Sequence, residues 1–388
     1  MKIYYQNNNS LVSEYQISLS KEFFLSKFNS NIDSIFINHS FSDIEFETYL
    51  NQDKEIVKSP NEIVDIRESE VFINLDLISI FYIASNLLKS KERSYFDNHN
   101  RLDISPDIFE DNGLPYIDLL INYINGHFDK VERGRIRLSM DVDHVQYKNL
   151  SLFRLMNEWR KFNKYQIPLK QITKLLLNNT NSRLDHVLKY SQILKDKSIS
   201  GDFFFMFCHL KTSFDSGYEI DKKIYKVMEE LVDSGHRIGF HPSYYAFKDE
   251  EKFHDEYQRY ISNFGKDFMI IRNHYLRNDY DNYWDLIEKY NFKEDHSIGM
   301  STNCGFFSGI SSGFSPINKK NKKFYNFKSF PLNYMDDYLF DNESYFDEFD
   351  NNISKILLNG CDVSLLFHNS LFLHTNYFKK FCDSWLLK

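Results

Sequence analysis

Past residue 130 the chain alternates short apolar runs with segments of helical periodicity, and this alternation limits the possible folds more than any other feature. Such repeats are typical of parallel strands joined by crossover helices. The sequence therefore predicts an α/β protein built on a distorted (β/α)7 barrel. The predicted strands are 135–140, 203–208, 237–240, 268–271, 297–300, 324–330 and 363–367.

The clearest connecting helix spans 221–234, where four apolar residues fall at i, i+3, i+4 and i+7 and Gly235 follows as a C-terminal cap. Residues 251–263 show the same helical periodicity of apolar residues, and a third helix is predicted around Trp284. The Asn-rich segment 163–200 is predicted to be helical in part. A long insertion of this kind is typical of the rim of an active-site face.

Residues 1–130 lack the regular alternation of apolar runs and helical segments that follows them. The sequence therefore predicts a smaller N-terminal α/β accessory domain at 1–130 and the catalytic barrel at 131–388. An alternating run at 35–39 predicts a strand, and apolar stretches at 71–88 and 116–123 predict buried helices. Polar residues interrupt 71–88, which therefore lacks the ~20 mainly apolar residues of a membrane span. The N-terminus also lacks the apolar core of an export signal, which predicts a cytoplasmic protein without an integral membrane segment.

Composition and charge narrow the classes of function. The hydrophobic content of 42% over 388 residues fits a globular chain, and the net charge of −8 argues against a broad nucleic-acid surface. The four cysteines lie far apart, without the spacing of a zinc knuckle or a disulfide framework. Neither a glycine-rich phosphate loop nor a G-x-S-x-G elbow occurs, so nucleotide binding and an α/β-hydrolase site are unsupported.

Titratable side chains are concentrated where the predicted strands end. The run 135–140 continues into Asp141, Val142 and Asp143, and side chains along a strand alternate between faces. The two carboxylates therefore face one cavity, where one could bind a divalent metal and the other act as a general base. A solvated strand end, or a helix cap by Asp143, is the structural alternative.

Three histidines follow other predicted strand ends. His241 lies near Ser243, whose hydroxyl could orient an imidazole or cap a helix, and His274 comes just after a later apolar run. Two imidazoles, one carboxylate and an open position form a catalytic zinc set. His368 ends the last strand, where a general acid could stand, although each histidine alone could equally be a core residue. Four histidines near strand ends are weaker candidates: His144, His209, His296 and His374.

Taken in order, these segments resemble the motifs of the polysaccharide deacetylase superfamily, the NodB-like proteins of carbohydrate esterase family 4, in a divergent branch. Residues 139–143 (Ser-Met-Asp-Val-Asp) are similar to the motif Thr-Phe-Asp-Asp-Gly, and 241–245 (His-Pro-Ser-Tyr-Tyr) to His-Ser/Thr-x-x-His. Residues 272–277 stand where the family has its arginine motif, and 365–368 match the closing Leu-x-x-His. The resemblance covers roughly residue 135 to the C-terminus.

Two other regions resemble the same branch. Residues 65–69, 87–88 and 96–101 are similar to its N-terminal accessory module, and 330–336 are similar to a Pro-x-x-x-Met-Asp signature. The resemblance therefore implies a NodB-like barrel preceded by an accessory module.

For function, the resemblance implies a metal-dependent deacetylase that hydrolyses an N-acetyl or O-acetyl group on a sugar or glycan precursor, in cell-surface polysaccharide biosynthesis. One divalent metal, zinc being the first choice, would activate water. Asp141 would be the general base and His368 the general acid. Arg272 or Arg277 would orient Asp141. The implied metal ligands are Asp143, His241 and His274, and the implied substrate contacts are Arg277, Asp336 and Ser243.

Three residues depart from the family pattern. Val142 stands where the family has its metal-binding aspartate, Tyr245 where it has the second motif histidine, and Phe307 where this branch has an arginine. Asp143 and His274 would then supply the missing ligands. Two rivals stay open: a catalytically inactive carbohydrate-binding or scaffold protein on the same fold, and another metal-dependent amidase or phosphoesterase. The sequence leaves the oligomeric state open.

Overall fold

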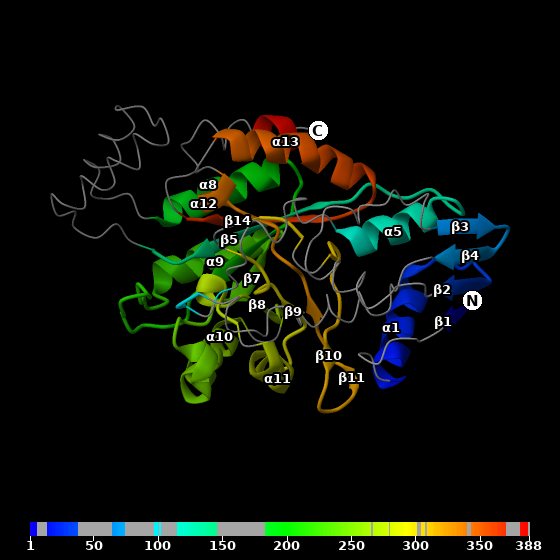
Figure 1. Ribbon diagram of the computed structural model, residues 1–388. Helices are drawn as coiled ribbons and strands as arrows, with labels where there is room; N and C mark the ends of the chain where they lie inside the picture. The colour runs from blue at the N-terminus through cyan, green and yellow to red at the C-terminus, as the bar shows by residue number, and fades with distance from the viewer. Residues whose placement is uncertain are drawn as a thin grey trace.

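The chain forms a large parallel sheet and a small N-terminal sheet (Figure 1). The computed structural model describes residues 1–5, 14–37, 64–73, 97–99, 101, 115–145, 183–264, 267–278, 280–300, 304–306, 309–339, 343–369 and 381–386. The large sheet has eight strands in the order β12-β9-β8-β7-β6-β5-β14-β13, and every neighbouring pair is parallel. It curls into a half-barrel, which agrees with the α/β barrel that the sequence predicts.

The strands of the large sheet vary in length, and the longest two lie side by side. These are β5 (Ile136–Val142) and β14 (Val363–His368), each buried along most of its length. Parallel strands covered on both faces read as continuous apolar runs, which is why the sequence reveals them. The other six are β6 (Gly201–Phe205), β7 (Arg237–Phe240), β8 (Ile270–Ile271), β9 (Glu294–Asp295), β12 (Lys328–Ser329) and β13 (Tyr334–Met335).

Six of the seven predicted strands overlap a strand of this sheet, and the one predicted at 297–300 does not. The strand there is β9, which is made of two charged residues. Arg237 on β7 reaches Glu294 with 2.8 Å between Nη1 and Oε1, and Asp295 accepts from the backbone N–H of Ser297. Ion pairs and hydrogen bonds hold this part of the sheet. The strand β13 also escaped prediction, so the sheet has eight strands and not seven.

The helices pack on the outside of the sheet, with α8 and α13 above it and α10 and α11 below it in the view of Figure 1. The three connecting helices predicted from periodicity are confirmed. Asp221 caps α9 by accepting from two backbone N–H groups, and Gly235 follows with φ +84°, a conformation that suits glycine. The bounds are α8 (Leu184–Asp196), α9 (Lys222–Asp233), α10 (Glu250–Phe264), α11 (Tyr280–Lys289), α12 (Asp336–Leu339) and α13 (Glu343–Leu358).

The N-terminal sheet has the strand order β1-β2-β4-β3, and helix α1 (Glu14–Lys27) follows its first strand. The strand predicted at 35–39 is confirmed as β2. The helix predicted at 71–88 is wrong at its start, because 71–73 belong to β4, where β-branched Val71 and Ile73 are fully buried. Its remainder lies outside the described residues. The strands are β1 (Lys2–Tyr5), β2 (Ser34–Ile37), β3 (Val64–Arg67) and β4 (Glu70–Ile73).

Helix α5 (Tyr116–Asn125), predicted from its apolar stretch, is bonded to the barrel part of the chain. The carboxylate of Asp118 accepts from the backbone N–H groups of Ser311 and Ser312, and Lys27 on α1 donates to the Ser312 hydroxyl. These bonds tie α1 and α5 to the loop before a hairpin of β10 (Ile317–Asn318) and β11 (Lys323–Phe324). The domain boundary near residue 130 stays a prediction. Among the described helices, none has the length and apolar character needed to cross a membrane.

Candidate active site

Four strand ends of the large sheet bring the predicted residues together. Asp141 is on β5, His241 directly follows β7, and His274 follows β8 in a short 3-10 turn, η6 (His274–Leu276). His368 is the last residue of β14, and the β14–β5 register places it beside Asp141. Because parallel strands end at the same edge of a sheet, residues distant in sequence meet there. The predicted convergence of strand ends is confirmed.

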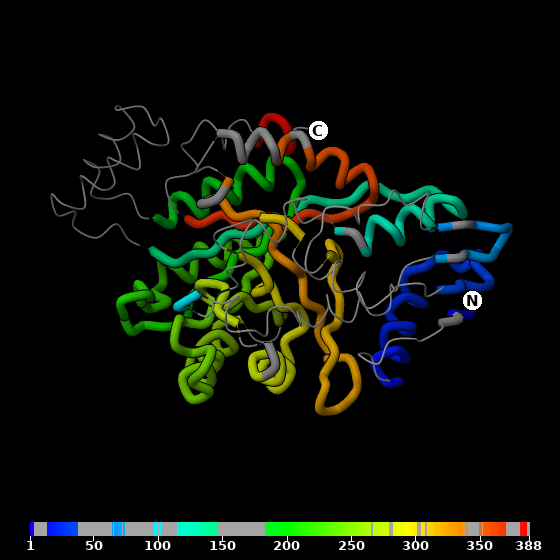
Figure 2. Tube along the Cα trace, in the orientation of Figure 1, coloured from blue at the N-terminus to red at the C-terminus, as the bar shows by residue number. Residues whose placement is uncertain are grey.

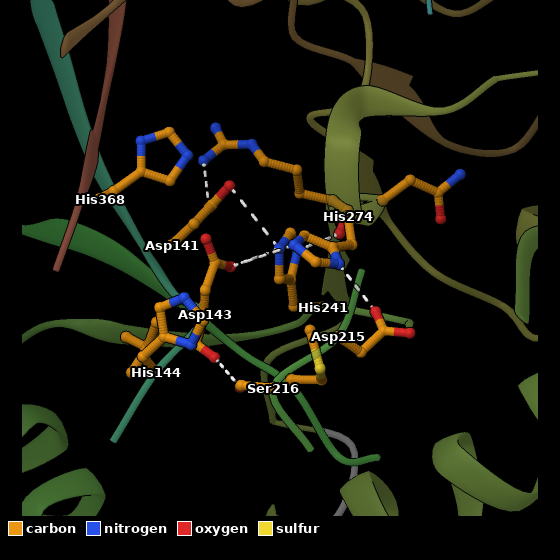
Figure 3. Close-up of polar contacts among 12 residues, drawn as sticks. Asp141, Asp143, His144, Asp215, Ser216, His241, His274 and His368 are labelled. Atoms are coloured by element: carbon orange, nitrogen blue, oxygen red, sulfur yellow. Dashed lines mark hydrogen bonds and ion pairs between the residues drawn. The ribbon is translucent and has the colours of Figure 1, made fainter. Parts of the chain in front are cut away.

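Three side chains at these strand ends, with Asp143 directly after β5, form a compact cluster that could hold a metal ion. The ligand atoms of Asp143, His241 and His274 all lie within 4.8 Å of one another. Oδ1 of Asp143 is 3.3 Å from Nε2 of His241 and 3.7 Å from Nε2 of His274, and Figure 3 shows the carboxylate pointing at both rings. One carboxylate and two imidazoles is a ligand set that zinc accepts, with a position left for chemistry.

The cluster contains polar atoms whose partners are missing from the protein itself. Oδ1 of Asp143 and Nε2 of His241 are buried, and neither forms a hydrogen bond. On its other side the His241 ring meets the carbonyl of Arg272, with 2.6 Å from Nδ1 to the oxygen. That bond places the ring proton on Nδ1 and leaves the Nε2 lone pair facing the cluster. Leaving such atoms unsatisfied costs about 1–3 kcal/mol each. A cation between them would satisfy both, so these residues fit a metal.

His274 is oriented by a buried carboxylate that the sequence did not reveal. Oδ1 of Asp215 lies 2.9 Å from Nδ1 of His274 and also accepts from the backbone N–H of Tyr244 at 2.8 Å. Its other oxygen accepts from the Thr212 hydroxyl. Nε2 of His274 therefore faces the cluster. After His274 the chain turns through left-handed φ angles at Tyr275 (63°). Backbone strain of this kind is frequent at functional sites.

The carboxylates and imidazoles of the cluster stabilise one another in their charged forms. Burial opposes ionisation of Asp143, but His274 and His241 outweigh it and hold the pKa of this carboxyl well below its ordinary value. Burial also lowers the pKa of His241, but Asp141 and Asp143 outweigh it, and the pKa lies above the ordinary value. Burial likewise opposes ionisation of Asp215, yet its bond to His274 leaves the pKa lowered. Two ionised carboxylates therefore surround the imidazoles.

Substituting Asp215 tests its role behind His274. We expect Asp215→Asn to weaken metal binding by about 10–100-fold, because a neutral amide polarises the imidazole less than a carboxylate does. Competition titration against a chromophoric chelator measures the change. Asp285→Asn is the matched control, since Asp285 pairs with Lys320 away from the cluster and should leave the affinity unchanged. If both variants bound the metal as tightly as the parent protein, Asp215 would have no role in supporting His274 as a ligand.

Asp141 lies beside the cluster, and its carboxylate is held by an arginine. Nη1 of Arg272 is 2.9 Å from Oδ1 of Asp141 and 2.9 Å from the hydroxyl of Ser139. The guanidinium is itself buried, with Nε donating to the carbonyl of His296 and its plane over the ring of Phe204. The sequence left Arg272 and Arg277 as alternatives, and Arg272 is the residue that pairs with Asp141. Oδ2 of Asp141 is 3.8 Å from Nε2 of His241 and faces the cluster.

His368, on the far side of Asp141 in Figure 3, is fixed by Asp336. Oδ1 of Asp336 is 2.7 Å from Nδ1 of His368, and Oδ2 accepts from the backbone N–H of the same residue at 2.8 Å. Asp336 is buried at the start of α12. Its observed partner is His368, and the substrate contact predicted for Asp336 stays a prediction. Nε2 of His368 is left on the side away from Asp336, where a proton could be donated.

Two further predicted substrate residues are engaged inside the protein. The Arg277 guanidinium donates to the carbonyls of His99 and Tyr244, with 2.8 Å from Nε to the His99 oxygen. The hydroxyl and backbone N–H of Ser243 both donate to the buried carboxylate of Glu256. These donors have internal partners in the structure, and the substrate contacts predicted for Arg277 and Ser243 stay predictions. They stabilise the loops that follow β7 and β8.

Two of the three departures from the family pattern have a structural explanation. Val142 is fully buried in the core, as expected for the residue between two site carboxylates on a strand. Tyr245 is 41% exposed and lies outside the cluster, whose third ligand position His274 fills. Phe307 lies outside the described residues. Of the weaker histidine candidates, His209 is exposed, His144 offers its carbonyl to Asn369, His296 is buried against Glu294, and His374 lies outside the described residues.

No known protein family matches the chain, and no curated protein matches it. Among solved structures, the chain is similar to one described as "putative polysaccharide deacetylase from Mycobacterium smegmatis". The TM-score is 0.41 and the sequence identity 12%, with 65% of this chain and 85% of that chain covered. Similarity this distant does not establish a shared activity, so the chemistry has to be inferred from the site itself.

Proposed function

We propose that this protein is a metal-dependent deacetylase, which hydrolyses the N-acetyl or O-acetyl group of a sugar or glycan precursor. The observation that carries the proposal is the cluster of Asp143, His241 and His274 beside a separate carboxylate, Asp141. When bound there, a divalent ion supplies Lewis acidity that polarises a carbonyl and acidifies water. Two imidazoles and a carboxylate favour zinc over magnesium or calcium, which prefer oxygen ligands alone.

The roles of the protein's own residues follow from their positions. Asp141, oriented by Arg272, accepts the proton of the attacking water, because its second oxygen faces the cluster and is not an assigned ligand. His368, held by Asp336, donates a proton to the leaving amine or alcohol. An amine is a poor leaving group unless it is protonated, so a general acid is needed beside the base, where His368 lies.

The choice of a sugar as substrate is supported by the order of the sequence motifs. Segments 139–143, 241–245, 272–277 and 365–368 occur in the order of the polysaccharide deacetylase motifs, and all four end at one edge of the sheet. The aromatic rings near the cluster, such as Tyr275 beside His274, could stack on the apolar face of a pyranose. Cell-surface polysaccharide biosynthesis is the process that such an activity would serve.

The proposal predicts bound zinc and acetate release. Elemental analysis of the purified protein should find close to one zinc ion per chain, and incubation with N-acetylglucosamine oligomers should release acetate together with free amine. Dialysis against a chelator should abolish the release, and added zinc should restore it. Metal-loaded protein that releases no acetate from N-acetylated or O-acetylated sugars would contradict the activity. Sugar binding without any turnover would instead support the inactive carbohydrate-binding rival.

A further inference from the structure

A short piece of the N-terminal region lies against the candidate active site. Figures 1 and 2 show residues 97–99 and 101 (cyan) among the green and yellow segments of the barrel, on the opposite side of the view from the N-terminal sheet. The ring of His99 packs against Phe214, Tyr244 and Tyr275, at 5.4–5.8 Å between centroids. Its Nδ1 is 2.8 Å from the hydroxyl of Tyr244. The segment is therefore docked by specific contacts.

The three aromatic residues under His99 belong to the loops that carry the metal cluster. Phe214 precedes Asp215, Tyr244 comes three residues after His241, and Tyr275 directly follows His274. Arg277 joins the segment to two of these loops, because it donates to the carbonyls of both His99 and Tyr244. The docked segment thus borders the site and has a fixed position relative to the cluster.

Within the segment, Asp97 fixes the side chain of Arg101. Oδ1 of Asp97 accepts from the backbone N–H groups of His99 and Arg101, and Oδ2 lies 2.7 Å from Nε of Arg101. Burial opposes ionisation of Asp97, but its bonds to Arg101 and His99 leave the pKa lowered. Ionised Asp97 therefore orients the Arg101 side chain through a hydrogen bond to Nε alone.

The guanidinium of Arg101 lies beside the ring of Tyr275, next to the loop that carries His274. Across the part of the chain that the structure describes, neither Nη atom makes a hydrogen bond to the protein. The guanidinium carbon lies 5.5 Å from the ring centre of Tyr275, and the side chain is only 21% exposed. The ring of Tyr275 lies in turn 4.7 Å from that of His274. The hydrogen-bond donors of the Arg101 guanidinium are therefore separated from the proposed metal ligand His274 by the ring of Tyr275.

We propose that Arg101 is a specificity-determining residue, which binds an anionic group, phosphate or carboxylate, on the sugar that is deacetylated. This inference rests on the proposed function and narrows its substrate class. A guanidinium whose two Nη groups have no hydrogen-bond partner among the described residues matches the paired oxygens of phosphate and carboxylate, and it discriminates them from neutral hydroxyls. Because Asp97 bonds only Nε and holds the guanidinium in place, little side-chain entropy is lost when the anion binds.

Kinetics on matched sugars test the proposal. The probes are N-acetylglucosamine 1-phosphate, N-acetylglucosaminuronic acid and neutral methyl N-acetylglucosaminide, assayed with the zinc-loaded protein. Arg101→Met should reduce the preference for the charged over the neutral sugar, measured as the ratio of kcat/KM values, by about 10–100-fold, the worth of a charge-assisted hydrogen bond. Arg101→Lys should retain part of it. Loss with the phosphate sugar alone, or with the uronic acid alone, identifies which anion is recognised. The exposed Arg133→Met is the charge-matched control and should keep the preference.

Two outcomes overturn the proposal. An equal loss on charged and neutral sugars would show that Arg101 only supports the loops, and an unchanged ratio would show that it contacts no anion. Titration calorimetry with the same probes separates this test from the proposed function, since it needs no turnover. If no sugar is hydrolysed, the deacetylase activity fails, but the difference in affinity between charged and neutral sugars still shows whether Arg101 binds the anion.

Discussion

Asp141→Asn is expected to lower kcat by about 10²–10⁴-fold while the protein keeps its metal, because asparagine cannot accept a proton from water. The substitution preserves the shape of the side chain and its acceptor oxygen toward Nη1 of Arg272, so the fold should be retained. Steady-state acetate release, together with elemental analysis of the same sample, measures both halves of this expectation.

Asp362→Asn provides the matched control for Asp141→Asn. Asp362 also pairs with an arginine across the β14–β5 pair, Arg137, with 2.8 Å between Nη2 and Oδ2, but at the opposite end of the strands. Breaking that pair should leave kcat within a factor of a few. Full activity in Asp141→Asn would remove the base assignment, whereas loss of both activity and metal would make Asp141 a ligand.

His274→Ala is expected to remove the metal. With Asp143 and His241 as the remaining ligands, the site offers two protein donors in place of three, and catalytic zinc sites use three. The affinity should fall by at least about 100-fold, more than loss of an outer-shell partner costs. Elemental analysis after dialysis should find little zinc, and acetate release should fall with it.

The exposed His209→Ala is the control for His274→Ala, because His209 also follows a strand end but lies outside the cluster. It should keep both zinc and activity. Full zinc occupancy in His274→Ala would show that another residue completes the site. The comparison is informative because Tyr245 stands where the deacetylase motif has its second histidine, and the whole metal assignment depends on His274 replacing it.

Much of the site could be predicted from sequence because its ligands follow apolar strands. Asp143, His241 and His274 each come within three residues of a strand that apolar pattern reveals, and parallel topology then brings them to one edge. Side-chain pairs between segments far apart in the sequence could not be predicted. Asp215 meets His274 across 59 residues and Asp336 meets His368 across 32, and packing alone brings them together.

The same distinction explains the errors in the predicted fold. The strands β9 and β13 have two residues each, too short to show a period of two, and β9 is charged. Apolar residues at 71–73 fit a helix as well as a strand until β2 and β3 pair with them on both sides. Short apolar runs are ambiguous by periodicity alone. The internal hydrogen bonds of Arg277 and Ser243 could not be predicted for a similar reason, since their partners, His99 and Glu256, lie in other segments.

The register of β14 against β5 decides which changes this protein could tolerate during evolution. His368 and Asp141 lie side by side on one face of the sheet because the register holds across the six paired residues of the two strands. A single-residue insertion or deletion inside either strand would turn one of the two side chains to the helix-covered face. The loops that continue from the strand ends at the site can lengthen or shorten without altering the spacing of base and acid. Substrate range can therefore diverge through the loops, while the spacing of the reacting groups is inherited with the sheet.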